Sequence, residues 1–544
     1  MKKRWRYFSG LFYVIPPWIV YAFLNIKMSL KMLDVMNAAI DNDWTAFWNN
    51  TIWLFVFLAL VYPMDILSSY ASITFTKKTV TKMKSDYIAA VFGKDIAEFQ
   101  KENNAAYLSA VTNDFAIIET DYISQIMEIV VNLIRFASAI IIFSIISPLI
   151  LLVGIGIVLI NGSLTIFIEK PVKKHNTERS VLYAEYNSFV KEVLSAFSII
   201  KNNNLETRIR KNFYDKSEKV QQKRYIIDKL MSFVFSAQNA IGMSIFIGMS
   251  LFAVWMTMIG TVTFAGIIII INNFGNLVNP MFSVAEAIPK FRSVRAIFIR
   301  IDKTLEQKNN HEETLPFNKF EHEITFKNVA FAYEDNPVVS HVDLTFEKGR
   351  KYLVIGPSGG GKSTLLRMLR KYFDPQEGII EIDGNNLSDI LKKEYFSKIA
   401  NIEQTIFLFE DTIRNNLTLF KDYSEEEIGD AVKKAGLDTF IDSNPEGLDY
   451  MIYDNGKNIS GGEKSRIAIA RGLLNKAQII FLDEAFASLD YDRAKKIEKT
   501  LLALDGVTVI NVSHVVIPEN KLAYDGICVV KNHTASMRLQ NQSE

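Results

Sequence analysis

One short stretch of the chain, Gly356–Thr364 (GPSGGGKST), carries residue types at a spacing that suits phosphate binding. Its glycines let successive backbone N–H groups turn toward phosphate oxygens, and a helix that begins at its end adds positive potential. The Lys362 ammonium can reach the β- and γ-phosphates of a nucleotide, and the Ser363 hydroxyl can bind Mg²⁺. The residues predicted to contact the nucleotide here are Gly356, Ser358, Gly359, Gly360, Gly361, Lys362, Ser363 and Thr364.

Acid–base side chains end two later apolar runs. The run QIIFLDEA (478–485) ends in two carboxylates, which is how a buried strand delivers acids to a phosphate site. We assign Asp483 to the Mg²⁺ shell, largely through water, and Glu484 to the water that attacks the γ-phosphate. The run VTVINVSH ends in His514, which is placed to touch the γ-phosphate. The alternative is a solvated strand end and an incidental histidine.

A second turn, Ser460-Gly461-Gly462, precedes the helical pattern EKSRIAIARGLL. Its hydroxyl and backbone N–H groups are free to meet an anion at a helix N-terminus. One chain does not need two such sites for one nucleotide, so we expect each to serve a different chain's ATP. The alternative is a serine N-cap followed by flexible glycines.

The elements that position these residues are read from apolar patterning. The runs ITFKNVAFAYED (324–335) and KYLVIG (351–356) are typical of strands, and KYLVIG leads directly into the phosphate loop. A polar, charged stretch with one proline precedes them and is typical of a linker. The predicted boundaries are a membrane domain over 1–303, a linker over 304–318 and a nucleotide-binding domain over 319–544.

The first part of the chain holds long uncharged runs, and about 20 apolar residues are needed to cross a bilayer as a helix. Tyr7–Ile26 and Trp44–Thr76, which is broken only by Asp65, each fit one span. The uncharged run Phe136–Ile168, taken with the residues from about Tyr122 onward, fits two spans with a turn at Ser147-Pro148, and the run 230–285 fits two that turn near Gly260. These runs predict six spans. An alternative for the first, a cleaved secretory signal, is disfavoured by Pro16-Pro17 and by the charge pattern of the later loops.

Lysine and arginine are concentrated at the start of the chain, in Lys77–Lys101, in Lys170–Lys229 and after the last span. Short positively charged loops stay in the cytoplasm, so both termini and the nucleotide-binding domain are predicted to be cytoplasmic. The two segments between spans have helical spacing and should extend the membrane helices into the cytoplasm.

Composition excludes two classes of site. The net charge of +1 lacks the basic excess of a broad nucleic-acid-binding surface. Cys528 is the single cysteine, which excludes an intrachain disulfide and a multi-cysteine metal site.

Polar residues form two one-sided stripes in the predicted spans, and such groups usually face a cavity or a partner. We expect them to line a path for cargo, with Asp65 as a possible addition, whereas the alternative is that they join helices structurally and that Glu128 pairs with Arg135. The predicted path residues are Glu128, Asn132, Arg135, Asn272, Asn276 and Asn279.

Taken in order, the motifs resemble those of the ATP-binding cassette (ABC) transporters, exporter-type half-transporters in particular. They are GPSGGGKST, Gln404 in NIEQTIF, ISGGEKSR, IIFLDE, SLD at 488–490 and His514. The resemblance implies a helical transmembrane domain of six spans with long cytoplasmic extensions, fused to an α/β P-loop cassette with a helical subdomain. Glu463 departs from it, because the family usually has glutamine there.

The resemblance also implies roles for site residues. Tyr333 would stack on adenine, and Gln404 would link the Mg²⁺ site to the membrane loops. Ser460, Gly461 and Gly462 would bind the γ-phosphate of the partner's nucleotide. Lys362, Glu484, His514 and Gln404 form the expected catalytic set, and Ser363, Gln404 and Asp483 the expected Mg²⁺ set.

The implied activity is ATP-driven export of a peptide, lipid or amphipathic small molecule across the cytoplasmic membrane by alternating access. The implied partners are a second half-transporter, membrane lipid and the cargo, with no nucleic acid. Because the catalytic set is intact, a homodimer is expected, with a heterodimer as the alternative. An ATP-gated channel or a regulatory membrane protein is the alternative function, and an importer is disfavoured because importers usually place their two domains on separate chains. The identity of the cargo cannot be read from the sequence.

Overall fold

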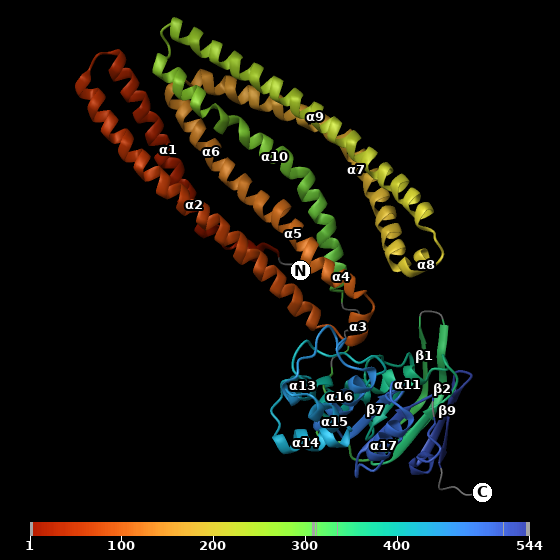
Figure 1. Cartoon of the computed structure of the whole chain (residues 1–544). Coiled ribbons are helices and arrows are strands. Elements are labelled where there is room, and N and C mark those ends of the chain that lie inside the picture. The colour runs from red at the N-terminus through yellow and green to blue at the C-terminus, as the bar shows by residue number, and fades with distance from the viewer. Residues whose placement is uncertain (1–3, 307–310, 312, 334–335, 515, 540–544) are drawn as a thin grey trace. The chain divides into compact units, whose positions relative to one another are not determined.

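The computed structural model divides the chain into two compact units (Figure 1). The helical unit comprises Met1–Lys94 and Glu102–Glu306, and the sheet unit comprises Asp95–Lys101 and Gln307–Glu544. The structure describes residues 4–306, 311, 313–333, 336–514 and 516–539. Part of the predicted linker and the first residues of the N-terminal basic cluster therefore lie outside the described residues.

The helical unit is built from long helices, with α1 beside α2 and α7 beside α9 (Figure 1). In chain order its elements are η1 (Arg4–Phe8), α1 (Leu11–Ile40), α2 (Trp44–Phe92), α4 (Asn104–Ser109), η2 (Ala110–Asp114), α5 (Phe115–Ile118), η3 (Glu119–Ile123), α6 (Ser124–Ile146), α7 (Pro148–Ser195), α8 (Phe197–Asn202), α9 (Glu206–Met258) and α10 (Phe264–Thr304).

The predicted turns between spans are confirmed, and local chemistry explains them. Ser147 caps α7 by accepting a hydrogen bond from the Ile150 backbone N–H, and Pro148 occupies the first helical position, where no N–H is needed. Between α9 and α10, Gly260 has φ 75°, a left-handed conformation that favours glycine.

The first helix is longer than the predicted span, because α1 continues to Ile40 instead of ending near Ile26. The extra residues include Leu, Met, Lys and Ala, which are strong helix formers, so the segment between the two apolar runs stays helical. The following break is short, and Asp43 caps α2 by accepting from the Ala46 N–H at 2.9 Å.

Two π-helical segments, η2 and η3, interrupt the helix that runs from Asn104 to Ile146. They are single-turn insertions of the kind that often occur at functional positions. Asp114, at the end of η2, is buried and accepts a hydrogen bond from Arg300 Nε on α10 at 3.0 Å. This pair fixes the π segment to the last long helix.

Three helices of the described residues are long and apolar enough to cross a membrane: Leu11–Ile40, Trp44–Phe92 and Asn104–Ile146. Gly242–Met258 and Phe264–Pro280 are apolar but shorter. The helical unit thus has the character of a transmembrane domain, and the exact number of six spans stays a prediction.

The sheet unit contains two sheets. One is antiparallel in the order β2-β1-β4-β5, and the other has the order β10-β9-β3-β8-β7-β6, parallel except for the edge strand β10. The strands are β1 (Glu323–Tyr333), β2 (Asn336–Glu347), β3 (Lys351–Ile355), β4 (Glu377–Ile382), β5 (Asn385–Asn386), β6 (Ile399–Ile402), β7 (Ile479–Asp483), β8 (Thr508–Val512), β9 (Gly526–Lys531) and β10 (Thr534–Leu539).

The helices of the sheet unit are α3 (Ile96–Gln100), α11 (Lys362–Leu369), η4 (Leu387–Asp389), α12 (Lys392–Lys398), α13 (Ile413–Thr418), α14 (Glu425–Lys434), α15 (Asp438–Ser443), η5 (Gly447–Asp449), α16 (Gly461–Leu474), α17 (Tyr491–Leu502) and η6 (Lys521–Ala523). The helices α13 to α16 form the predicted helical subdomain, with α16 against α13 and α14.

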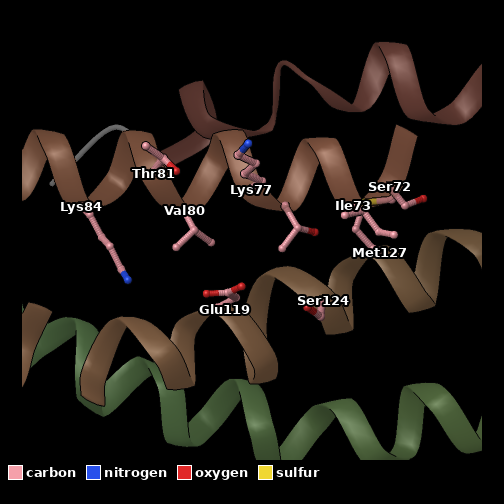
Figure 2. Close-up of a pocket in the computed structure, with 10 residues that line it drawn as sticks. Ser72, Ile73, Lys77, Val80, Thr81, Lys84, Glu119, Ser124 and Met127 are labelled. Carbon is pink, nitrogen blue, oxygen red and sulfur yellow. The ribbon is translucent and has the colours of Figure 1, made fainter. Parts of the chain in front are cut away.

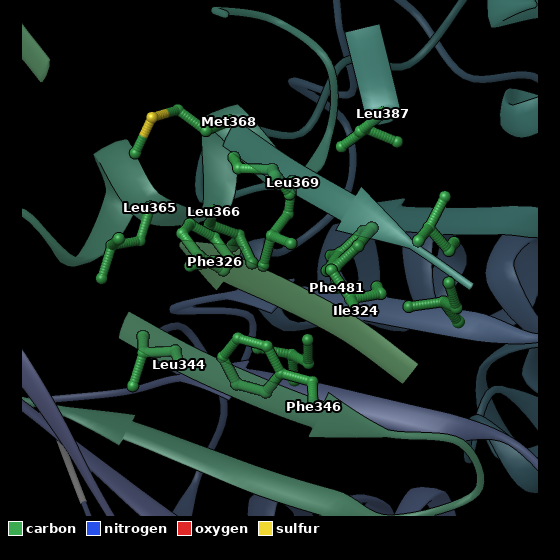
Figure 3. Close-up of a cluster of buried hydrophobic side chains, with 14 of the residues drawn as sticks. Ile324, Phe326, Leu344, Phe346, Leu365, Leu366, Met368, Leu369, Leu387 and Phe481 are labelled. Carbon is green, nitrogen blue, oxygen red and sulfur yellow. The ribbon is translucent and has the colours of Figure 1, made fainter. Parts of the chain in front are cut away.

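The main core of the sheet unit lies between α11 and both sheets (Figure 3). Leu365 and Leu369 of α11 belong to one buried cluster with Phe326 of β1, Phe346 of β2 and Phe481 of β7. Burial of such side chains contributes about 1.5–3 kcal/mol each. The core therefore holds α11, and with it the phosphate loop, against the ends of the parallel strands.

Two segments that precede the first strand of the sheet unit in the sequence also belong to this unit. Leu315, within the predicted linker, forms a parallel β-bridge with Ile390, and Glu313 Oε1 lies 3.0 Å from Lys371 Nζ. The segment that contains α3 groups with this unit as well, and Lys392 Nζ lies 2.9 Å from Asp95 Oδ1.

Candidate functional site

The phosphate loop joins β3 to α11, in the predicted strand–loop–helix arrangement. At Gly356 an added Cβ would lie 2.1 Å from the Val530 carbonyl oxygen. Gly361 has φ 101°, and a Cβ there would lie 2.9 Å from the Val338 carbonyl oxygen. Both positions require glycine, because neighbouring backbone fills the space that a side chain would take.

Lys362 is buried beneath this loop, where Nζ donates to the carbonyl oxygens of Gly356 and Pro357 at 3.0 and 2.9 Å. Burial lowers the pKa of Lys362, and the nearby carboxylates Glu484 and Asp483 oppose the shift. The next hydroxyl, Ser363 Oγ, donates to Asp483 Oδ1 at 3.3 Å. The structure therefore brings the loop lysine and serine to the first of the two predicted acids.

Glu484 is the centre of the second cluster. Its backbone has φ 51°, and its N–H donates to the Val512 carbonyl at 2.9 Å, so the residue turns away from the end of β7. Oε2 accepts from Gln404 Nε2 at 2.7 Å, and Oε1 lies 2.8 Å from His514 Nε2. Gln404 and His514, which were predicted from separate motifs, thus both contact the Glu484 carboxylate.

Asp483 lies deeper than Glu484, and burial raises its pKa. Behind it lies the buried Arg370, whose Nη1 is 3.8 Å from both Asp483 Oδ2 and Glu403 Oε1. The Tyr372 hydroxyl donates to the same Glu403 oxygen at 2.7 Å. Glu403 is the residue immediately before Gln404 in the sequence. Arg370 therefore provides a positive charge between the Asp483 strand and the Gln404 segment.

Sequence reasoning missed Arg370, Tyr372 and Glu403. An arginine in the last turn of an amphipathic helix ordinarily pairs with the helix dipole at the surface. No pattern marks this one as buried. Arg367 lies on α11 and Arg370 is the C-cap residue that follows it, and the structure exposes the first and buries the second.

The Ser460-Gly461-Gly462 turn begins α16 with a capping box. Ser460 Oγ accepts from the Glu463 N–H at 3.3 Å, and Glu463 Oε2 accepts from the Ser460 N–H at 2.7 Å. The serine N-cap that was the alternative reading is therefore present, and Glu463 completes it. Within the described residues Ser460 forms no hydrogen bond with the phosphate loop of its own chain.

Tyr333 ends β1 beside an aromatic group. Its ring meets Phe331 and Phe373 edge to face, with centroids 5.1 and 5.7 Å apart, and its hydroxyl accepts from Arg367 Nη1 at 3.3 Å. Tyr333 is 37% exposed, so part of the residue is accessible to a ligand.

In the helical unit the predicted polar stripes meet each other in part. Asn132 Nδ2 donates to Ser283 Oγ at 2.6 Å, and the Ser283 hydroxyl donates to Glu128 Oε1 at 3.3 Å. Gln125 joins this group by donating to Glu128 and accepting from Lys290 Nζ at 2.8 Å. These five residues form a polar cluster between α6 and α10.

The other stripe residues lie apart from that cluster. Arg135 is placed over the Trp18 ring, 5.6 Å from its centroid, and in the described residues no ion pair joins it to Glu128. Asn276 donates to Asn273 at 3.4 Å, and Asn272 and Asn279 are exposed. The structural pairing of Glu128 with Arg135 is therefore wrong, and helix joining is done by Asn132.

Comparisons with known proteins agree with both units. The family model described as ABC transporter matches residues 339–487, and the model described as ABC transporter transmembrane region matches residues 12–281. An uncharacterised ABC transporter ATP-binding protein of Bacillus subtilis, YfiC, is 25% identical over 470 residues, which are 84% of this chain and 77% of that protein.

Two other relatives are named for what they transport. An ATP-dependent lipid A-core flippase of Desulfotalea psychrophila is 39% identical over 210 residues, 38% of this chain and 36% of the flippase. A putative multidrug export ATP-binding/permease protein of Staphylococcus aureus is 30% identical over 353 residues, 62% of this chain and 60% of that protein. The matches thus span less than two thirds of either relative.

Among solved structures, a bacterial Atm1-family ABC exporter with ATP bound superposes with a TM-score of 0.78 and 21% identity, over 95% of this chain and 93% of that one. At this identity the likeness shows the fold. With both family models matched along one polypeptide and the phosphate loop, acids and histidine assembled as described, the chain belongs to the ABC transporters, as a membrane-spanning exporter whose ATP-binding domain couples ATP hydrolysis to transport.

Proposed function

We propose that the chain is one half of a homodimeric, Mg²⁺-dependent export pump, in which each ATP is bound between the phosphate loop of one copy and the Ser460–Gly462 turn of the other. The observation that carries the proposal is the meeting of Gln404, Glu484 and His514 at one carboxylate. A single chain supplies every hydrolytic group, so two identical copies supply two complete sites.

Glu484 is assigned the role of general base in this site. Its two oxygens are held by Gln404 and His514, so the carboxylate is oriented before the substrate water arrives. It accepts the proton of the water that attacks the γ-phosphorus, and the bond to the β–γ bridging oxygen breaks, with ADP and phosphate as products. Lys362 and the loop N–H groups stabilise the charge on the β- and γ-phosphate oxygens.

The residues present fit Mg²⁺. Hard cations of this kind take oxygen ligands from one or two side chains and from substrate phosphates. The Ser363 hydroxyl and the Asp483 carboxylate are such donors and lie 3.3 Å apart, so Ser363 and Asp483, with Gln404, would hold the ion. Bound Mg²⁺ would neutralise charge on the β- and γ-phosphates.

The lysine-rich loops support a cytoplasmic placement of both termini and of the sheet unit, in the cytoplasmic membrane. The tip formed by α8 supports a dimer. Leu194, at the end of α7, and Phe197 and Ile199 of α8 are 68%, 62% and 62% exposed there, which is unusual for apolar side chains at a tip predicted to be in water. We assign this tip to the sheet unit of the second copy, and α3 to the sheet unit of its own chain.

The cargo path is assigned to the stripe residues that the polar cluster leaves unpaired. Asn272 and Asn279 are exposed on α10, whereas Asn132 is buried against Ser283. The double substitution Asn272→Leu and Asn279→Leu should change cargo-stimulated ATP hydrolysis with little effect on basal hydrolysis. Asn132→Leu should instead lower the thermal midpoint, and equal effects of both variants on basal turnover would contradict the assignment.

Cysteine crosslinking tests the arrangement of the two copies. Cys528 is buried, with its pKa raised to about 12 by burial, so it is unreactive and can stay in the chain. In a Glu484→Gln background that carries Ser358→Cys and Ser460→Cys, mild oxidation with Mg-ATP should give disulfide-linked dimers. Omitting nucleotide is the control. Crosslinks confined to single chains, or equal yields without ATP, would overturn the proposal.

A further inference from the structure

A groove of about 480 Å³ lies in the helical unit between the start of the chain and one face of α2. The wall from α2 follows helical spacing, so the groove runs along the helix and not across it. Its lining residues are Arg6, Tyr7, Ser9, Gly10, Tyr13, Val14, Leu67, Tyr70, Ala71, Thr74, Phe75, Lys78, Thr79 and Lys82.

The groove changes polarity from one end to the other. Leu67, Tyr70 and Ala71 line the end that belongs to the uncharged run of α2, and Tyr13 and Tyr70 are 81% and 67% exposed. Lys78 and Lys82 line the other end, directly after the uncharged run stops at Thr76. The apolar end of the groove thus leads to two lysine side chains at the predicted surface of the bilayer.

The two cations are available to a ligand. Lys78 and Lys82 are exposed, and in the part of the chain that the structure describes their side chains form no ion pair or hydrogen bond. Arg6 lies at the same end, where Asp86 holds it in place at 2.7 Å and also accepts from the Tyr7 hydroxyl. Two unneutralised ammonium groups and a fixed guanidinium therefore face the groove.

A second cavity on another face of α2 provides a contrast. It measures about 490 Å³, and Lys77 and Lys84 line it together with Glu119 of η3 (Figure 2). Glu119 lines this second cavity together with the two lysines. No acid lines the first groove in the described residues, and Asp86, near its basic end, is bonded to Arg6 and Tyr7. The two pairs have the same charge on the same helix but different surroundings.

We propose that the groove between η1, α1 and α2 binds an anionic phospholipid of the cytoplasmic leaflet, with an acyl chain along Leu67, Tyr70 and Ala71 and the headgroup phosphate at Lys78 and Lys82. Charge complementarity and the change of polarity along the groove select this occupant over a neutral lipid. The inference rests on the proposed cytoplasmic orientation of the lysine-rich end. It adds a lipid site that is separate from the cargo path.

The test is lipid retention by the full chain without nucleotide. The protein is extracted by detergent from vesicles of equal parts phosphatidylcholine and phosphatidylglycerol, and the two retained lipids are counted by mass spectrometry. Each basic residue near an anionic lipid surface contributes about fivefold in affinity, so Lys78→Gln with Lys82→Gln should lower phosphatidylglycerol enrichment by about tenfold or more. Ala71→Trp, which fills the groove at unchanged charge, should lower it as well.

The matched control is Lys77→Gln with Lys84→Gln, which should keep enrichment within about twofold, because these lysines line a different cavity together with Glu119. Equal losses in both lysine pairs would indicate general surface attraction and overturn the site. Absence of enrichment in the unaltered chain would also overturn it. Displacement of the lipid by inorganic phosphate would mark a site for soluble anions instead.

Failure of this proposal and failure of the pump can be told apart. A Lys362→Ala chain, impaired in nucleotide binding, should retain phosphatidylglycerol like the unaltered chain. In the unaltered chain, absence of ATP-dependent transport with intact lipid retention would count against the pump alone, and absence of retention with intact transport would count against the lipid site alone.

Discussion

Two helices of the sheet unit, α14 and α16, begin with the same capping box. Ser424 and Glu427 form the box of α14, and Ser460 and Glu463 form the box of α16. In each helix the serine side chain accepts from the glutamate N–H, and the glutamate side chain accepts from the serine N–H. The residues between serine and glutamate differ: two glutamates in α14 and two glycines in α16. Identical backbone geometry is thus combined with opposite chemistry in the first turn.

The difference shows what makes a helix start suitable for an anion. A helix N-terminus offers unpaired N–H groups and positive potential, but three carboxylates in the first turn of α14 would repel a phosphate. The first turn of α16 carries one carboxylate, which its own cap already uses. The glycines leave the backbone N–H groups accessible. The capping box stabilises the helix in both cases, and the residues inside it decide whether a ligand can approach.

The sharpest test makes α16 resemble α14. The double substitution Gly461→Glu and Gly462→Glu gives Ser-Glu-Glu-Glu and keeps the capping box. Loss of transition-state contacts to the γ-phosphate should lower ATP turnover by about 100-fold or more, measured as phosphate release. The fold should survive, because an added Cβ meets only ordinary contacts, 3.5 Å to Ser488 Cβ and 3.4 Å to Leu489 Cδ2.

Two control measurements separate a loss of phosphate contacts from a loss of folding. The thermal midpoint of the full chain should stay close to that of the unaltered chain, and binding of nucleotide to the phosphate loop should persist. Turnover within about threefold of the unaltered chain would mean that α16 is an ordinary capped helix, since oxyanion contacts ordinarily contribute far more.

A smaller effect is expected from the two capping serines. Ser424→Ala and Ser460→Ala should each lower the free energy of unfolding by about 1 kcal/mol, because each removes one N-cap hydrogen bond. Turnover should fall about tenfold or more in Ser460→Ala, where one hydrogen bond to a charged phosphate oxygen is lost, and should stay unchanged in Ser424→Ala. Equal turnover in both variants would remove the functional distinction between the two helices.

The reverse exchange affects stability alone. Glu425→Gly with Glu426→Gly gives α14 the Ser-Gly-Gly-Glu start of α16. Glycine has low helix propensity and the first turn loses two favourable acids, so the free energy of unfolding should fall by about 1–2 kcal/mol. ATP turnover per folded molecule should not change. A lower helix propensity at Glu425 and Glu426 affects only the start of α14. A gain or loss of turnover beyond about twofold would therefore show that α14 also acts in the ATP cycle.

The sequence predicted the parts of the sheet unit whose physics is local. Strands β1, β3, β7 and β8 appear where apolar runs placed them, and the phosphate loop needs glycine at Gly356 and Gly361 for steric reasons. The meeting of Gln404, Glu484 and His514 also follows, because parallel strands deliver their ends to one edge of the sheet.

Features that depend on how individual side chains pack were not predictable. Arg370 is a surface-like arginine by sequence, and only the packing of α11 under Asp483 buries it. Glu463 looked like a departure from a motif, but the fold uses it as a cap. In the helical unit, the polar stripe residues could line the cargo path or join neighbouring helices. The Asn132–Ser283 hydrogen bond shows that Asn132 joins helices, and it says nothing of the other stripe residues.

The smallest expected effect concerns acid stability, through the glutamate of the α14 capping box. Hydrogen bonding from Lys476, followed by hydrogen bonds from the Ser424 N–H and hydroxyl, lowers the pKa of Glu427 to about 2 from an ordinary value of 4.5. A carboxyl whose pKa is lower in the folded state stabilises the fold above pH 4.5 and loses this contribution as the pH falls toward 2. The thermal midpoint of the unaltered chain should therefore fall more steeply over this window than that of Glu427→Gln. Lys476→Met should reproduce most of the change, because it removes the largest cause of the shift. Parallel pH dependence in all three proteins would show that the α14 box contributes only its neutral hydrogen bonds, and the two helix starts would then differ in ligand access alone.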